Sequence, residues 1–135
     1  MPAASKERIL IVDDQKDICE LLSRYLTAEG YMCATAHSGE MALKMIEDEH
    51  FDHVLSDIMM PGMSGIDLLN IVKTLFPEVA MFMVTAVDDK ATGLLAVELG
   101  AVGYMCCFRQ IKRKKVLVVD YLLRDWSEAS APVPA

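Results

Sequence analysis

Three aspartates and a threonine are the residues of this sequence best suited to do chemistry. Asp13, Asp14, Asp57 and Thr85 each come at the end of a run rich in Val, Ile, Leu or Met. Carboxylates brought together repel one another, so they either raise a pKa or bind a cation. Magnesium suits such a site because it takes hard oxygen ligands, and an aspartate can also attack phosphorus to form an aspartyl phosphate. These residue types predict a magnesium-dependent phosphoryl site, with Asp57 as the nucleophile and the Thr85 hydroxyl as a hydrogen-bond donor.

The apolar runs are predicted to be strands of one parallel sheet, because helical patterns separate them. Unbroken apolar character suits strands that are covered on both faces. The predicted strands lie at 8–12, 31–36, 52–56, 79–84 and 102–106. The predicted helices lie at 16–29, after Ser38, from Ser64 to Pro77, at 88–99 and at 111–126. This alternation indicates an α/β fold, in which the site lies beyond the carboxyl ends of the strands.

Several helix ends carry specific signals. Ser38 and Ser64 are predicted N-caps, and Asp67 completes a capping box with Ser64. Gly30 and Gly100 are predicted to close the first and the fourth helix, since glycine adopts the left-handed conformation at low cost. These signals fix where four of the connections between strands and helices should turn.

The helices differ in how much core they are expected to supply. The helix after Ser64 is predicted to turn four apolar residues inward: Leu68, Leu69, Val72 and Leu75. The helix at 88–99 is Ala-rich, carries Gly93 in its middle and should be the loosest of the set.

The three histidines have no metal-ligand spacing and are expected to be exposed: His37, His50 and His53.

The composition sets the broad class of the protein. A chain of 135 residues that is 53% hydrophobic suits one domain with a well-buried sheet. The formal net charge of −7 argues against a nucleic-acid surface, which needs a basic face. No apolar run reaches the ~18 residues of a membrane span, and the start lacks the order of a signal peptide, so a cytoplasmic protein is expected. The predicted organisation is a leader at 1–5, one domain at 6–126, and a disordered tail or linker at 127–135.

Four segments together resemble the receiver domain of bacterial two-component response regulators. They are ILIVDD at 9–14, FDHVLSDIMMPGMSG at 51–65, MVTA at 83–86 and ELGAVGYM at 98–105. The resemblance covers roughly residues 6–126. It implies a flavodoxin-like, doubly wound, five-stranded parallel sheet in the order 2-1-3-4-5, with five helices.

The resemblance also implies a role for each residue at the metal site. Asp57 would be the phosphoacceptor and one of the ligands of magnesium. Asp14 would ligate the metal directly, and Asp13 through water. The backbone carbonyl of Met59 would supply a further oxygen. The cofactor expected from the resemblance is therefore magnesium.

Signalling follows from the same resemblance. The phosphoryl group would come from a phosphohistidine of a histidine kinase or phosphotransfer protein, and the hydroxyl of Thr85 would move toward it. Tyr104 would change rotamer with Thr85, although a plain half-buried strand aromatic remains the alternative for that residue. The change would alter an interaction face for a downstream effector protein or domain, and a homodimer is compatible with it. Such a domain assists its own phosphorylation and dephosphorylation and is not a metabolic enzyme.

Two adjacent positions depart from the receiver pattern. Receivers normally carry a lysine just after the fifth strand, usually followed by proline, and here those positions hold Cys107 and Phe108. Neither side chain replaces the charge of the lysine, which would offset the carboxylates and grip the phosphoryl group. The alternative function is therefore a degenerate receiver, a protein-interaction module whose phosphorylation is impaired.

Overall fold

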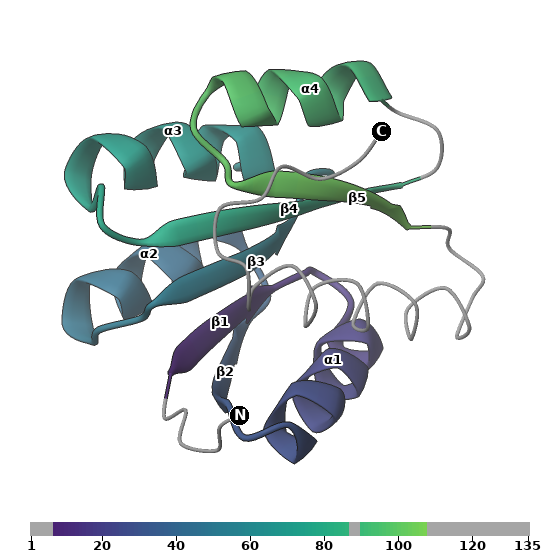
Figure 1. Cartoon of the computed structure of the whole chain (residues 1–135), viewed down its shortest axis with the longest axis vertical. Coiled ribbons are helices and arrows are strands. Elements are labelled where there is room, and N and C mark those ends of the chain that lie inside the picture. Colours follow the sequence, from purple (N-terminus) through teal and green to yellow (C-terminus); the bar gives the residue numbers. More distant parts are fainter. Residues whose placement is uncertain (1–6, 87–89, 108–135) are drawn as a thin grey trace.

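Five parallel strands form one sheet at the centre of the molecule (Figure 1). The computed structural model describes residues 7–86 and 90–107, apart from the side chains of residues 85, 86, 90 and 105–107. The sheet has the order β2-β1-β3-β4-β5, and all neighbours pair in parallel. The order predicted from the sequence is therefore confirmed. The strands along the chain are β1 (Arg8–Val12), β2 (Met32–Ala36), β3 (His53–Asp57), β4 (Ala80–Ala86) and β5 (Gly103–Cys107).

Four helices connect the strands within this part of the chain. They are α1 (Lys16–Ala28), α2 (Gly39–Asp48), α3 (Gly65–Leu75) and α4 (Lys90–Glu98). One face of the sheet is covered by α1, and the other by α2, α3 and α4 (Figure 1). The predicted fifth helix at 111–126, the leader at 1–5 and the tail at 127–135 lie outside the described residues.

The strands supply buried side chains to both faces, which explains their unbroken apolar runs. Leu10 and Val12 of β1 join the core under α2 and α3, whereas Ile9 and Ile11 join the core under α1. All four are at most 1% exposed. Successive side chains of a strand point to opposite faces, so a strand covered on both sides needs an apolar residue at every position.

The helix ends follow the sequence signals. The Oγ of Ser38 accepts a hydrogen bond of 3.0 Å from the N–H three residues later. Ser64 and Asp67 form the predicted capping box, in which each side chain accepts from the other residue's N–H at 3.1 and 3.2 Å. Gly30 and Gly100 follow α1 and α4 with φ values of 103° and 116°. These left-handed residues end the two helices where the sequence predicts.

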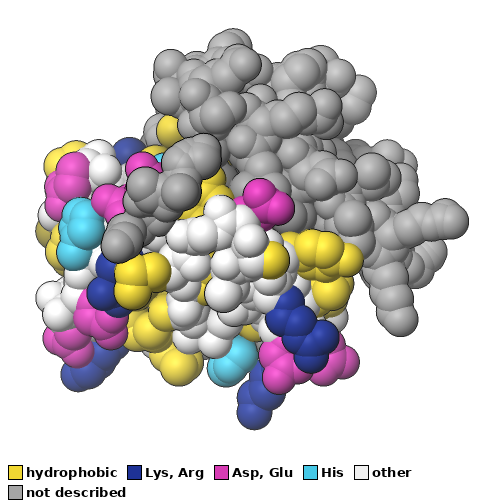
Figure 2. Space-filling model, turned by 60° about the horizontal axis from the view of Figure 1, so that its bottom comes forward, with side chains coloured by type: hydrophobic (Ala, Val, Ile, Leu, Met, Phe, Trp, Pro, Cys, Tyr) yellow, Lys and Arg dark blue, Asp and Glu magenta, His cyan; other side chains and the backbone are white. Residues whose placement is uncertain are grey.

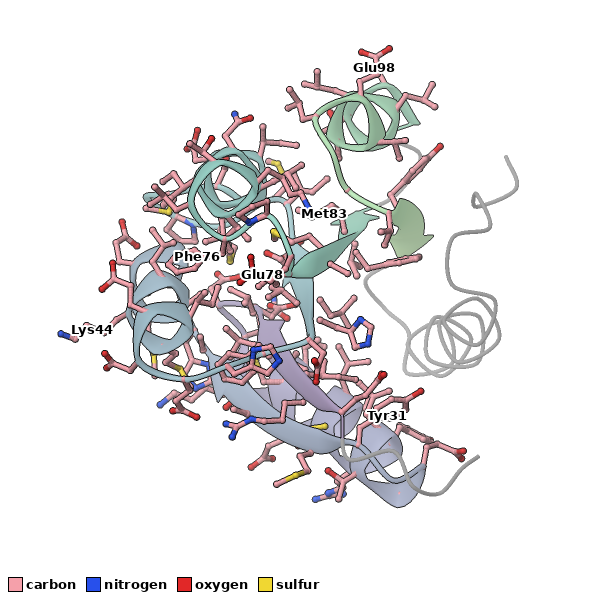
Figure 3. All side chains as sticks on the ribbon, turned by 60° about the vertical axis from the view of Figure 1, so that its left-hand side comes forward. Tyr31, Lys44, Phe76, Glu78, Met83 and Glu98 are labelled. Carbon is pink, nitrogen blue, oxygen red and sulfur yellow. The ribbon has the colours of Figure 1, made fainter. Side chains whose placement is uncertain are left out.

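The end of α3 contradicts one prediction, and the packing of α4 agrees with another. Leu75 was predicted to face inward, but its side chain is 60% exposed. It is the last residue of α3, and the following Phe76 packs against the core instead (Figure 3). In α4, Leu94 and Leu95 are 56% and 44% exposed, while the small Ala96 is fully buried. The helix at this position supplies little large apolar core, as its composition indicates.

Charged side chains are spread over the outside of the described fold among polar and apolar ones (Figure 2). Lys44 of α2 and Glu98 of α4 point away from the sheet (Figure 3). On the face that Figure 2 shows, acidic and basic side chains are interspersed, and the described residues of that face form no continuous basic patch. No helix in the described ranges is long and apolar enough to cross a lipid bilayer.

Candidate functional site

Three carboxylates meet at the carboxyl end of the sheet. One oxygen each from Asp13, Asp14 and Asp57 lies within 4.8 Å of the other two. Asp13 and Asp14 come directly after β1, and Asp57 is the last residue of β3. Since β1 and β3 are neighbours in the sheet, their ends place these side chains side by side. The structure thus brings together the three acids that the sequence singles out.

The three carboxylates differ in their surroundings. Asp13 is only 7% exposed, and its Oδ1 accepts a hydrogen bond of 2.9 Å from the N–H of Gln15. Asp57 is half-buried, and its Oδ1 accepts a 3.3 Å hydrogen bond from the N–H of Met59. Asp14 is exposed to solvent. Three like charges at this spacing repel one another, and a divalent cation with oxygen ligands stabilises such a cluster.

The start of α3 holds the backbone of Asp57 in place. The N–H of Gly65 donates a 2.8 Å hydrogen bond to the carbonyl of Ile58. A Cβ atom added to Gly65 would lie 2.3 Å from the carbonyl oxygen of Asp57 and 2.7 Å from the Cα of Ile58. Only a glycine allows this approach, so the helix packs directly against the chain that carries Asp57. This role of Gly65 is not predicted from the sequence, although a glycine directly after the cap Ser64 is a signal for it.

The other predicted site residues surround this cluster to differing degrees. The side chain of Met59 is 65% exposed beside Asp57. Thr85 directly follows Val84, the residue of β4 that pairs with Asp57, so its backbone lies at the site. Cys107 is the last residue of β5 and pairs with Ala86. The side chains of Thr85 and Cys107 lie outside the described residues, so their predicted roles stay predictions.

Tyr104 lies one strand away from the acids. It belongs to β5, where it pairs with Met83 of β4. Its side chain is partly buried and packs against the core beneath α4. This position fits both the switch residue that the resemblance implies and a plain half-buried strand aromatic.

The expected exposure is wrong for two of the three histidines. His37 is half-buried, with its Nδ1 3.7 Å from Cys19 Sγ, and His53 lies at the amino end of the sheet, opposite the acidic cluster. The side chain of His53 is only 15% exposed, and its Nε2 lies 2.8 Å from Glu7 Oε1. It is held inward because it begins β3, whereas His50 precedes the strand, is 66% exposed and pairs with Asp52 at 2.9 Å. Burial raises the pKa of the Asp52 carboxyl. Hydrogen bonds from the Arg8 N–H and from His50 together lower this pKa by more than burial raises it, so the pKa lies below its usual value. These groups lie at the amino end of the strands, whereas the acidic cluster lies at their carboxyl end.

Comparison with known proteins assigns this fold to one class. Residues 9–117 match the response regulator receiver domain, and the chain belongs to that family. It is a receiver domain of the two-component response regulators, a class that works in phosphorelay signalling. Receiver domains depend on magnesium in general and interact with histidine kinases and effector domains.

Individual relatives and structures agree with this assignment. The chain is 40% identical over 102 residues to the alkaline phosphatase synthesis transcriptional regulatory protein PhoP of Bacillus subtilis, covering 73% of this chain and 41% of PhoP. It is 37% identical over 97 residues to the transcriptional regulatory protein ZraR of Escherichia coli, covering 72% of this chain and 22% of ZraR. The chain therefore spans less than half the length of these relatives.

Solved receiver structures superpose on most of this chain. The CheY-like receiver domain protein of Methanospirillum hungatei has a TM-score of 0.78 at 29% identity, covering 92% of this chain and 96% of that one. The response regulator TrrA of Thermotoga maritima, solved in complex with Mg²⁺ and BeF, has a TM-score of 0.69 at 32% identity. That comparison covers 84% of this chain and 97% of TrrA.

Proposed function

We propose that Asp57 is the phosphoacceptor of this receiver domain. It would take the phosphoryl group from a phosphohistidine of a histidine kinase or phosphotransfer protein. A carboxylate oxygen of Asp57 forms the new P–O bond while the P–N bond to the donor imidazole breaks, and the released imidazole nitrogen takes up a proton. The observation that supports this proposal is the convergence of Asp13, Asp14 and Asp57 within 4.8 Å at the carboxyl end of the sheet.

The same three acids are the proposed magnesium ligands, together with the backbone carbonyl of Met59. The donor set fits magnesium, since it consists of hard oxygen atoms, and the exposure of Asp14 leaves room for water ligands. Bound magnesium would neutralise charge that builds on the phosphoryl oxygens. Asp13 is held by the Gln15 N–H and Asp57 by the Met59 N–H, so both carboxylates are oriented before any ligand arrives.

The response would pass from the site to the face formed by α4 and β5. In this proposal the Thr85 hydroxyl moves toward the phosphoryl group, and Tyr104 changes its position with it. The altered face would bind a downstream effector protein or domain, or a second copy of the chain. The net charge of −7 supports a protein partner rather than direct binding of nucleic acid by this domain.

Two further properties belong to the proposal. The domain would assist its own phosphorylation and dephosphorylation and would not act as a metabolic enzyme, since the acids already account for the chemistry of the site. It would work in the cytoplasm, where kinases with phosphohistidine act. In this role the domain would not bind a membrane.

Intact-protein mass spectrometry tests the acceptor. The protein is incubated with magnesium and a small acyl phosphate as the phosphodonor, and one added phosphoryl group is the expected result. Asp57→Asn should abolish the adduct. Asp48→Asn is the matched control, because Asp48 is an exposed aspartate at the end of α2, away from the acidic cluster, and this variant should keep the adduct.

The same experiment separates the two functions considered for this sequence. An adduct that survives Asp57→Asn would show that another residue is the acceptor. If neither wild type nor control takes up a phosphoryl group, from the small donor or from a phosphorylated histidine phosphotransfer domain, the domain is the phosphorylation-impaired interaction module. The cysteine at position 107, where receivers normally carry a lysine, is the reason for testing this alternative.

A further inference from the structure

The middle of α4 contains a glycine that its backbone does not require. Among the described glycines, positive φ values occur at Gly30, Gly62 and Gly100, and Gly93 therefore has a backbone that any residue adopts. Glycine inside a helix is less favourable than alanine. The residues around Gly93, rather than its backbone conformation, determine which side chains fit at position 93.

The ring of Tyr104 occupies the space where a side chain of residue 93 would begin. A Cβ atom on Gly93 would lie 2.2 Å from Cδ2, 2.3 Å from Cε2 and 2.6 Å from Cγ of Tyr104. Real Cβ atoms do not approach other heavy atoms this closely. The aromatic ring therefore lies directly on the helix backbone at Gly93, and even a methyl group would displace it.

This contact lies within the packing of α4 on the sheet. The helix packs against β4 and β5, and it turns Gly93 and Ala96 inward. Figure 3 looks along α4 above β5 and shows Glu98 on the side away from the strand. Leu94 and Leu95 are largely exposed on the helix surface. With such small inward residues, the ring of Tyr104 supplies much of the bulk between this helix and the strand.

We propose that Gly93 is a positioning residue for Tyr104. The missing side chain forms a seat that holds the ring partly buried between β5 and α4 before any phosphoryl group is added. The functional meaning of this seat rests on the proposed function, in which Tyr104 is the switch aromatic. Any side chain at position 93 would force the ring to turn outward or the helix to lift, and either change alters the face that a partner meets.

Fluorine NMR of protein labelled with 3-fluorotyrosine tests the position of the ring. The chain has four tyrosines, and Tyr104→Phe identifies the signal of interest by its disappearance. In Gly93→Ala, this signal should shift and broaden more strongly with a soluble paramagnetic reagent, because the ring becomes exposed. Ala91→Gly, an exposed position of the same helix, is the control and should leave the signal unchanged. An unchanged Tyr104 signal in Gly93→Ala would overturn the proposal.

A double-mutant cycle measures the contact independently of the label. Glycine to alanine in a free helix interior raises the ratio of folded to unfolded protein about fourfold to fivefold. We expect this gain when Gly93→Ala is made in the Tyr104→Ala background, and its loss or reversal when Tyr104 is present. An equal gain in both backgrounds would refute the contact. Should Gly93→Ala alone fail to fold, folding of the double variant supports the seat, and failure of both variants counts against it.

Failure of the seat and failure of the proposed function give different results. The ring position and the cycle are measured without a phosphodonor, whereas phosphoryl uptake by Asp57 is read from the intact mass. Gly93→Ala should still accept the phosphoryl group, since α4 contributes none of the three acids. A wild-type protein that takes up no phosphoryl group, but shows a buried Tyr104 ring released by Gly93→Ala, would contradict only the proposed function.

Discussion

Replacing Gly65 by alanine tests whether close packing of α3 holds the acidic site in place. The added Cβ would lie 2.3 Å from the carbonyl oxygen of Asp57 and 2.7 Å from the Cα of Ile58. Both neighbours are backbone atoms of a buried segment, so they cannot turn aside as a side chain would. Overpacking of this kind costs about 1–3 kcal/mol or more. We expect a loss of unfolding free energy at the upper end of that range, and a smaller stabilisation by magnesium because Asp57 is displaced.

Gly39 provides a matched control within the same fold. Like Gly65, it is the buried first residue of a helix and follows a serine N-cap. Its added Cβ would meet the side chain of Met63, with Sδ at 2.8 Å and Cγ at 2.9 Å. Met63 Cβ also lies at 3.0 Å, but the side chain is flexible and can repack, so Gly39→Ala should cost less than Gly65→Ala.

Urea denaturation of both variants, with and without magnesium, measures these differences. The slope of unfolding free energy against urea should stay the same, so that the midpoints report stability alone. Gly39→Ala should keep the full magnesium effect, and Gly65→Ala should lose most of it. Equal costs for the two variants, or an unchanged magnesium effect in Gly65→Ala, would refute the argument that this contact positions Asp57.

Three further predictions concern the charges of the domain. Asp13→Asn should reduce the magnesium-induced rise in unfolding free energy, which is about 2.7 kcal/mol at a hundred times the Kd. Thermal denaturation with and without the metal measures this rise, and an unchanged rise would exclude Asp13 from the site. Cys107→Lys should speed phosphorylation from a small donor about tenfold or more, since a cation about 4 Å from a carboxylate is worth up to about 4 kcal/mol before desolvation. Time-resolved intact-mass measurements give the rate of phosphorylation. An unchanged rate would show that a side chain at this position does not reach the site. The lowered pKa of Asp52, caused by the Arg8 N–H and His50 hydrogen bonds that outweigh burial, means that its stabilisation is present above about pH 4 and is lost as pH falls through the folded-state pKa. The difference in unfolding free energy between wild type and Asp52→Asn should therefore shrink below about pH 4, and a constant difference would contradict the assignment.

The architecture and the acids of the site follow from patterns in the sequence. Runs such as 9–12 have no polar residue and must be covered on both faces, which indicates parallel strands with helices on each side. Local signals fixed the helix ends, because the capping box of Ser64 and Asp67 and the closing Gly30 depend only on near neighbours in the chain. The rule that sites lie at the carboxyl ends of parallel strands then predicted that Asp13 and Asp57 meet.

Contacts between segments that are far apart in the chain are visible only in the folded structure. The burial of His53 depends on its place at the start of β3 and on Glu7, 46 residues earlier. Leu75 is exposed because α3 ends there and Phe76 fills the space over the core. The role of Gly65 comes from its approach to Asp57, and that of Gly93 from the ring of Tyr104. Sequence patterns report the preference of each segment for burial, whereas these distances arise only once the segments pack together.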